Sequence, residues 1–300
     1  MSALNKVVLA SLPYFPRPVM RHLARRYIAG EELEDALTKL ADLAGRGHPG
    51  ILDILGENVA DEAAAREVAQ SYKAAASAVA QRKLPAYVSV KPTHVGLTMR
   101  EELCFELYAD IAAHCAPLGL FVRIEMEDHP TTDGTLRVFE RLRKSYANVG
   151  IVLQSRLFRT PSDIARLAPG PLDVRVVKGI YLEPPAIAHT DPDAIRDAYV
   201  ACTKLLLERD AKLSLATHDE GLGERCLSLV REFRRPRESY EFQVLLGVRE
   251  PLWQRWRDAG HTVRVYVPYG PDWRAYSTRR LRKNPQILTH VMKDTLLFWR

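Results

Sequence analysis

Two adjacent arginines near the C-terminal end of the sequence have the residue types and spacing of a binding site. Arg279 and Arg280 share one face of a predicted helix with Tyr276 and Lys283, because these positions are spaced i, i+3, i+4 and i+7. The forked donors of a guanidinium fit two oxygens of a carboxylate or phosphate at once. The stretch therefore predicts an anion clamp, although the same residues also fit a solvated helix face.

The predicted helix follows a segment with the pattern of a β-strand. Residues 263–267 alternate valine with arginine and tyrosine. The proline and glycine in residues 268–270 are expected to end this strand. Pro271 and Asp272 suit the start of a helix. The arginine pair is thus expected on a helix just beyond the end of a strand.

Strand-like segments recur along the chain, and a helical or polar segment separates each from the next. The eight predicted strands span residues 51–55, 86–91, 121–126, 150–155, 172–178, 212–218, 240–246 and 261–267. Strands that alternate with helices favour a parallel sheet, and eight units favour a closed (βα)8 barrel, an α/β fold of the TIM type. We expect a helical segment over residues 1–49 and the barrel domain over residues 50–300.

In such a barrel, functional groups gather at the C-terminal ends of the strands. Nearly every predicted strand ends on a polar or ionisable residue. The strand-end residues are Asp53, Glu57, Lys91, Glu125, Glu127, Asp128, Gln154, Arg175, Lys178, Thr217, His218, Asp219, Gln243, Leu245 and Tyr266. Any one of them suits a solvated loop, but a cluster of partly desolvated polar groups costs stability. Their concentration at one end of the barrel therefore predicts a functional site.

The composition is ordinary for a soluble globular protein, with 47% hydrophobic and 27% charged residues among 300. The net charge of +6 comes without a basic tail, so we expect no nucleic-acid surface and at most a weak attraction to anionic membranes. The four cysteines lack CxxC spacing, which favours buried, reduced thiols. No signal peptide or membrane-spanning run is recognisable, and a cytoplasmic location is expected.

Two other chemistries fit parts of the pattern. His218 and residues 125–129 include metal-ligand types, but no HxH or HExxH spacing occurs, and no metal site is predicted. Lys178 ends a strand, and a desolvated lysine there could act as an amine nucleophile in a Schiff-base lyase. The neighbouring Arg175 makes the pair better suited to holding an anionic cofactor or substrate.

Taken in order, the strand-end motifs resemble the catalytic domain of proline dehydrogenase, a flavin-dependent family that oxidises L-proline. The matching segments are DILGENV (53–59), YVSVKPTHVGL (87–97), VRIEMEDH (122–129), LQSRLFRT (153–160), VRVVKGIYLEP (174–184), ATHD (216–219), EFQVLLGV (241–248) and YSTRR (276–280). They follow the family's order and resemble its short, stand-alone bacterial form. The resemblance implies a distorted (βα)8 barrel with FAD lying across the strand ends.

The resemblance also implies roles for individual residues. The implied catalytic residues are Arg175, beside flavin N5, Lys91 and Glu125. The implied cofactor contacts, besides Arg175, are Gln154, Lys178, Thr217 and His218. The implied substrate contacts are Arg279, Arg280 and Lys91 at the carboxylate, with Leu245, Tyr266 and Tyr276 around the ring. Glu57 would pair with Arg279 as a gate over the closed site.

The implied reaction is hydride transfer from C5 of L-proline to flavin N5, which gives Δ1-pyrroline-5-carboxylate. Electrons would then pass to a quinone, which implies peripheral contact with the inner face of the membrane. Two positions depart from the family's usual pattern: Glu125 replaces an aspartate, and Lys283 replaces a glutamate. These departures leave open a different cyclic amino acid, such as hydroxyproline, or a flavin-binding barrel with impaired turnover.

Overall fold

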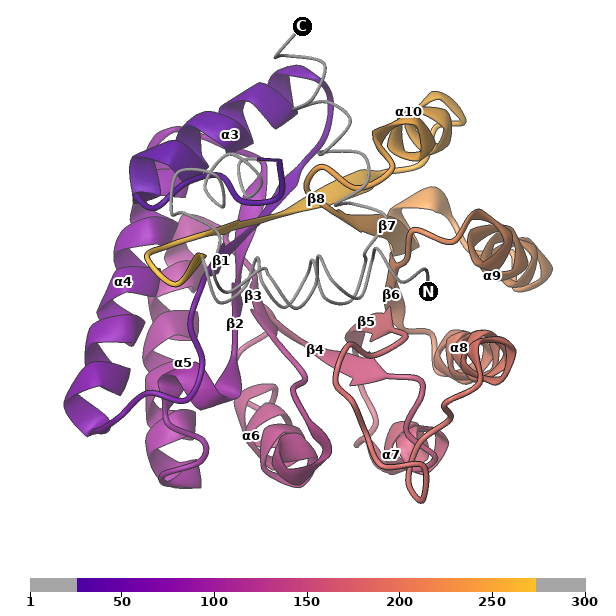
Figure 1. Cartoon of the computed structure of the whole chain (residues 1–300), viewed down its shortest axis with the longest axis horizontal. Helices are drawn as coiled ribbons and strands as arrows, with labels where there is room; N and C mark the ends of the chain where they lie inside the picture. The colour runs from indigo at the N-terminus through magenta and orange to yellow at the C-terminus, as the bar shows by residue number, and fades with distance from the viewer. Residues whose placement is uncertain (1–25, 274–300) are drawn as a thin grey trace, which may run out of the picture.

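The computed structural model describes residues 26–273 of the chain. Its eight parallel strands close into a barrel, in which each strand pairs with its sequence neighbours and the last pairs with the first (Figure 1). The strands are β1 (Gly50–Ile54), β2 (Ala86–Val90), β3 (Val122–Ile124), β4 (Val149–Gln154), β5 (Asp173–Val177), β6 (Lys212–Ala216), β7 (Tyr240–Leu245) and β8 (Val263–Tyr269). The predicted barrel and all eight predicted strands are confirmed, with ends that differ by at most two residues.

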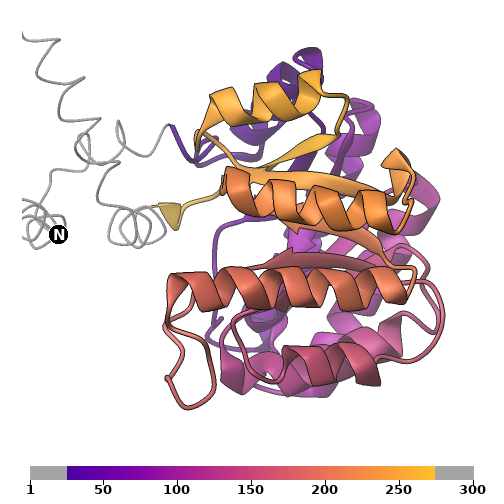
Figure 2. The ribbon, with the colours of Figure 1, turned by 90° about the vertical axis from the view of Figure 1, so that its right-hand side faces the viewer.

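The helices that join successive strands surround the barrel, as Figures 1 and 2 show from two directions. The helices are α3 (Leu33–Gly45), α4 (Glu62–Gln81), α5 (Glu101–Cys115), α6 (Thr132–Leu142), α7 (Thr160–Arg166), α8 (Pro192–Glu208), α9 (Glu220–Glu232) and α10 (Glu250–Asp258), with 3-10 helices η2 (Pro92–Val95), η3 (Ala116–Leu118), η4 (His129–Thr131) and η5 (Arg237–Ser239). Among these described helices, none is long and apolar enough to cross a membrane.

The seam between β8 and β1 is covered by α3, which precedes β1 in the chain. In Figure 1 this helix lies between α4 and α10, and it contacts both seam strands. Its buried residues are Ala36, Leu37, Leu40 and Leu43, which form the apolar stripe of an amphipathic helix. Leu40 lies so close to Gly50 that any Cβ at that position would collide with it. An N-terminal helix therefore completes the ring. A helical segment was predicted over residues 1–49, but residues 26–32 are not helical. Residues 1–25 lie outside the described part.

Aspartates begin three of the helices that follow strands. The Asp61 carboxylate accepts a hydrogen bond from the Ala64 amide at 2.8 Å at the start of α4. Asp191 and Asp219 cap α8 and α9 in the same way. An aspartate at this position satisfies backbone donors that have no partner within the helix. The caps fix where the chain leaves each loop above the barrel, and so shape the end of the barrel that carries the site.

The two faces of the strands differ in chemistry. The outer face is apolar and packs under the helices, for example Leu52, Val90 and Ile124, all fully buried. The inner face carries many polar side chains: Asp53, Ser89, Arg123, Asp173, Arg175, Ser214, Glu241, Gln243 and Arg264. Branched apolar residues usually fill a TIM barrel. The polar lining here is held by hydrogen bonds and ion pairs that cross the barrel.

The predicted end of the last strand at Pro268 was wrong, because β8 continues to Tyr269. Pro268 faces Asp53 in the register, and its carbonyl accepts a hydrogen bond from the Ala29 amide at 2.9 Å. The Tyr269 carbonyl accepts from the Leu55 amide at 2.7 Å. Proline lacks only the donor of a strand residue, so its carbonyl still takes part in pairing.

Candidate active site

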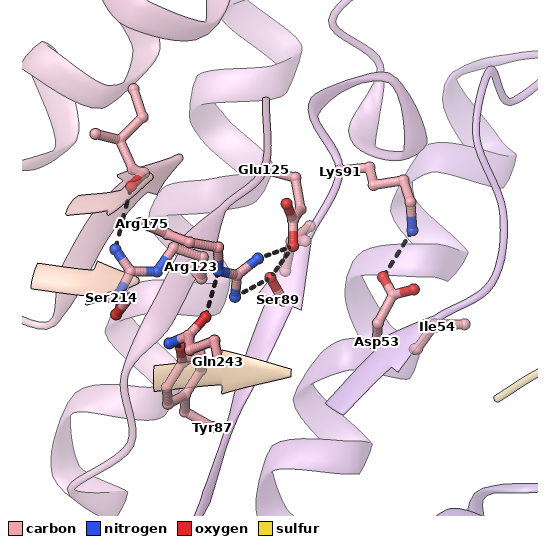
Figure 3. Close-up of polar contacts among 12 residues, drawn as sticks. Asp53, Ile54, Tyr87, Ser89, Lys91, Arg123, Glu125, Arg175, Ser214 and Gln243 are labelled. Atoms are coloured by element: carbon pink, nitrogen blue, oxygen red, sulfur yellow. Dashed lines mark hydrogen bonds and ion pairs between the residues drawn. The ribbon is translucent and has the colours of Figure 1, made fainter. Parts of the chain in front are cut away.

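Five of the predicted strand-end residues lie near one another in the C-terminal half of the barrel (Figure 3). Figure 3 shows Arg175 reaching Glu125 and Gln243, while Lys91 points to Asp53. These side chains come from or directly follow five different strands. Closure of the barrel is what brings them within hydrogen-bonding distance, since they are far apart in the sequence.

Arg175, on β5, is the centre of this cluster and is only 3% exposed. Its Nε donates to Gln243 Oε1 at 2.5 Å, and its Nη1 donates to Glu125 Oε1 at 2.5 Å. The ring of Tyr266 lies with its centroid 5.5 Å from the guanidinium carbon. Burial opposes the charge, but the Glu125 carboxylate together with Tyr87 and Tyr266 outweighs burial, and the pKa of Arg175 is raised. The residue is therefore a fixed, permanent cation.

Glu125 follows β3 and holds Arg175 from the side of the barrel opposite Gln243. Its Oε1 also accepts a hydrogen bond from Ser89 Oγ at 2.5 Å. Burial favours the neutral acid, yet Arg175, Ser89 and Lys91 together lower the pKa of Glu125 below its ordinary value. The carboxylate is thus ionised at neutral pH and compensates the guanidinium charge.

Lys91, directly after β2, forms an ion pair with Asp53 of β1, with 2.7 Å between Nζ and Oδ1. The Asp53 side chain is fully buried, and burial raises its pKa although Lys91 opposes the shift. For Lys91, burial is outweighed by the carboxylates of Asp53, Glu125 and Glu127, so its pKa is raised. The ammonium is retained. Asp53 was predicted at a strand end without a role, and only the register of β1 and β2, which pairs it with Ser89 two residues before Lys91, places it beside Lys91.

Gln154 is the last residue of β4, and only the nitrogen of its side-chain amide has a hydrogen-bond partner in the described part of the chain. Its Nε2 donates to the backbone carbonyl of Glu127, whereas Oε1 is buried and has no hydrogen-bond partner among residues 26–273. Gly179, at a φ of +100°, lies against this oxygen, and a Cβ there would come within 2.5 Å of Oε1. Only glycine adopts this backbone conformation without strain. A buried, unused acceptor beside bare backbone fits a ligand that brings a donor.

Thr217 and His218 follow β6, where the backbone turns into α9. The Thr217 hydroxyl accepts a hydrogen bond from the Asp219 amide at 3.0 Å. His218 Nε2 accepts from the Leu245 amide at 3.0 Å, which fixes the ring against the end of β7. The His218 carbonyl accepts from Arg249 Nη1 at 2.7 Å. The structure thus joins three of the predicted site residues, Thr217, His218 and Leu245, in one loop cluster.

Lys178 lies beyond β5 in an ion pair with Asp219, at 2.8 Å between Nζ and Oδ2. Asp219 also accepts from Arg196 Nε at 2.7 Å and caps α9 through Leu222. Two cations and a helix N-terminus at one place favour an anionic ligand. A Schiff-base lysine needs an amine that is free to attack, whereas the Nζ of Lys178 contacts the Asp219 carboxylate. The arrangement therefore favours anion binding over amine catalysis.

Glu57, the predicted gate, lies half-buried in the loop that follows β1. The backbone N–H of the next residue, Asn58, donates a hydrogen bond to Thr93 Oγ1 at 3.1 Å. This bond ties the loop to the segment that follows β2. The intended partner Arg279 lies outside the described residues. So do three further residues of the predicted clamp face: Tyr276, Arg280 and Lys283.

Comparison with known proteins adds a family to this geometry. Residues 36–292 match the family model described as proline dehydrogenase. The chain belongs to the proline dehydrogenase family. Proline dehydrogenase 1 of Bacillus subtilis subsp. natto is 33% identical over 273 residues, which cover 91% of this chain and 90% of the relative. Proline dehydrogenase of Deinococcus radiodurans is 34% identical over 285 residues, covering 93% of this chain and 92% of the relative.

A solved structure agrees with this assignment. The chain is similar to proline utilization A from Bdellovibrio bacteriovorus, inactivated by N-propargylglycine, with a TM-score of 0.82 and 26% identity. The match covers 88% of this chain but 33% of that one, so this chain spans about a third of the longer protein. The predicted family is confirmed, and with it an oxidoreductase that is a proline dehydrogenase.

Glu127 is a further residue of this proline dehydrogenase to which the sequence analysis gave no role. Its carboxylate accepts from both the amide and the hydroxyl of Thr93, each at 2.8 Å. Burial raises the pKa of Glu127 to about 6, against the opposing effect of the Thr93 hydrogen bonds. Because Thr93 also holds Asn58, Glu127 supports the loop that carries Glu57. Its only sequence signal was its place in the MEDH motif beyond β3.

Proposed function

We propose that this member of the proline dehydrogenase family catalyses the FAD-dependent oxidation of L-proline to Δ1-pyrroline-5-carboxylate. The observation that supports this most directly is the buried cation Arg175, held between Glu125 and Gln243 at the C-terminal end of the barrel. A cation there suits a cofactor that gains negative charge when it is reduced. The family match independently favours a redox reaction of proline.

The residues at the strand ends fit FAD by their chemistry. Gln154 offers a buried acceptor with no partner in the described part of the chain, beside the bare backbone of Gly179. Lys178, near the N-terminus of α9, suits the phosphate and ribose portions. Thr217 and His218 are proposed contacts on the same side. When bound, FAD would supply the hydride acceptor at flavin N5.

The chain's own contribution is position and electrostatics. Arg175 is rigid and stays charged, so it can stabilise negative charge at the flavin edge without rearranging. Lys91 is the proposed donor to the substrate carboxylate within the described chain, and its ammonium is maintained by Asp53. Tyr266 and Leu245 are proposed to wall the pyrrolidine ring. Oxidation removes a hydride from C5 and the proton from the ring nitrogen, which leaves the C=N bond of the product.

Other proposed contacts come from the family resemblance and lie beyond residue 273. Arg279 and Arg280 are proposed to bind the substrate carboxylate, with Tyr276 beside the ring. Glu57 is proposed to close over the site by pairing with Arg279. We propose a quinone as the electron acceptor and a cytoplasmic location with transient contact at the inner face of the membrane. The net charge of +6 suits an anionic surface.

The spectrum of the purified protein tests this proposal. We expect bound flavin with absorbance at about 450 nm that bleaches when L-proline is added without oxygen. A parallel test with trans-4-hydroxy-L-proline shows whether Glu125 or Lys283 has changed which cyclic amino acid the enzyme prefers. Faster reduction by hydroxyproline would reassign the substrate. A protein that binds flavin but is reduced by neither would contradict the proposed dehydrogenase activity.

A further inference from the structure

The guanidinium of Arg175 is held at its Nε by a neutral side chain inside the barrel, Gln243 of β7. The bond from Arg175 Nε to Gln243 Oε1 is 2.5 Å long, and Gln243 is only 4% exposed. Glu125 and Ser89 contact the other guanidinium nitrogens, at 2.5 and 3.4 Å. Figure 3 shows the amide of Gln243 and the carboxylate of Glu125 on different edges of the guanidinium. Two edges held at once fix the plane as well as the position of the group.

The amide of Gln243 can satisfy its neighbours in one orientation only. Its Nε2 donates to the Tyr87 hydroxyl at 2.7 Å and to Glu241 Oε1 at 2.6 Å. A glutamine amide has two N–H donors, and these two acceptors use both. An amide turned by 180° would direct its oxygen at the Glu241 carboxylate and its N–H groups at Arg175, which is unfavourable at both ends. The carbonyl is therefore committed to Arg175.

The acceptor that orients the amide is itself held. Glu241 Oε1 and Oε2 accept from Arg264 Nε at 2.8 and 3.0 Å. Arg264 donates in turn to the Gly50 carbonyl at 3.3 Å, which ties it to β1. Its guanidinium carbon lies 4.8 Å from the centroid of the Tyr87 ring. The layer nearer the N-terminal end of the barrel thus forms a rigid platform below Gln243.

We propose that Gln243 is a positioning residue for Arg175, and that Glu241 and Arg264 act through it by fixing the direction of its amide. The inference rests on the proposed function, in which Arg175 is the cation beside the flavin. Gln243 would not touch the reacting atoms. It would set the place and plane of the charge that does, and a displacement of about 1 Å can cost up to about a hundredfold in rate.

Gln243→Leu removes the acceptor for Arg175 and keeps a side chain of similar bulk. The readouts, on protein with bound FAD, are the midpoint potential of the flavin in a dithionite titration and the rate of flavin reduction by L-proline. We expect a shift to lower potential, because the cation no longer stabilises the reduced form, and a reduction rate lower by about tenfold or more. The dissociation constant for L-proline should change far less than the rate.

Two further variants separate positioning from general stability. Asn148→Leu removes a half-buried amide that donates to the Ala112 and Leu120 carbonyls, both at 3.0 Å, without touching Arg175. It should leave both potential and rate unchanged. Glu241→Gln keeps Gln243 and removes only the charge that orients it, so it should shift the potential in the same direction by a smaller amount.

An unchanged potential in both Gln243→Leu and Glu241→Gln would overturn the inference, as would equal shifts in the Asn148→Leu control. If L-proline fails to reduce the wild-type flavin, the proposed function fails, whereas the dithionite titration still measures whether Gln243 controls the charge beside the flavin. If Gln243→Leu does not fold, the Glu241→Gln titration decides the question by itself.

Discussion

Replacing Glu125 with glutamine would leave the Arg175 guanidinium buried without its carboxylate. Removing one partner of a buried ion pair costs about 3–5 kcal/mol. The glutamine oxygen can still accept one hydrogen bond, so we expect a loss of about 3 kcal/mol at pH 7. An unfolding entropy of about 2.1 cal/mol/K per residue then predicts a decrease in Tm of about 5 °C for a chain of this length.

The pH dependence of this loss follows from the lowered pKa of Glu125. A carboxylate whose pKa is lower in the folded state stabilises the fold above its unfolded pKa, and this stabilisation disappears as the pH falls through the folded value. Below the ordinary value of 4.5 the unfolded chain gains this proton first, and the folded residue gains it, and comes to resemble glutamine, only below its lowered pKa. The difference in unfolding free energy between wild type and Glu125→Gln should therefore shrink as the pH falls below that value.

Urea unfolding followed by circular dichroism, in excess FAD, would measure these differences. Glu125→Asp is the matched control, because it keeps the charge and shortens the side chain by one methylene. It should lose less than half as much stability as Glu125→Gln. The ion-pair argument is refuted if Glu125→Gln is as stable as wild type at pH 7, or if the difference grows on acidification.

Three other predictions concern the substrate, the cofactor and pH. Lys91→Met should raise the KM for L-proline about tenfold in steady-state assays, and an unchanged KM would exclude Lys91 from the substrate site. Lys178→Met should weaken FAD binding about tenfold in fluorescence titrations, with the exposed Lys204→Met as control; equal effects would argue against a specific contact. Burial lowers the pKa of His94 to about 4, so between pH 6.5 and pH 4 the unfolded chain binds a proton that the folded chain does not. The free energy of unfolding should therefore fall by about 3 kcal/mol over this range. In urea unfolding, His94→Gln should lack this pH dependence of the unfolding free energy. A pH dependence equal to that of wild type would contradict the assignment to His94.

Much of the fold, and the clustering of polar residues at the strand ends, followed from local patterns. The alternation of apolar and polar residues marks a strand wherever it occurs, and the eight alternating units predicted the barrel. A parallel barrel puts the ends of all its strands on one face, so chain order alone predicted that Lys91, Glu125 and Arg175 would lie near one another. These inferences needed no knowledge of distances.

The partners of each residue were decided only by the tertiary structure. Lys91 pairs with Asp53, 38 positions away, and Arg175 with Gln243, 68 positions away. Which side chains meet across a barrel depends on the tilt and stagger of its strands, and no local pattern encodes these. The same holds for α3, which lies in the predicted helical segment but whose place over the seam between β8 and β1 was not predicted. The sequence by itself therefore determined which groups lie at the strand ends, and barrel closure determined which of them hold one another in place.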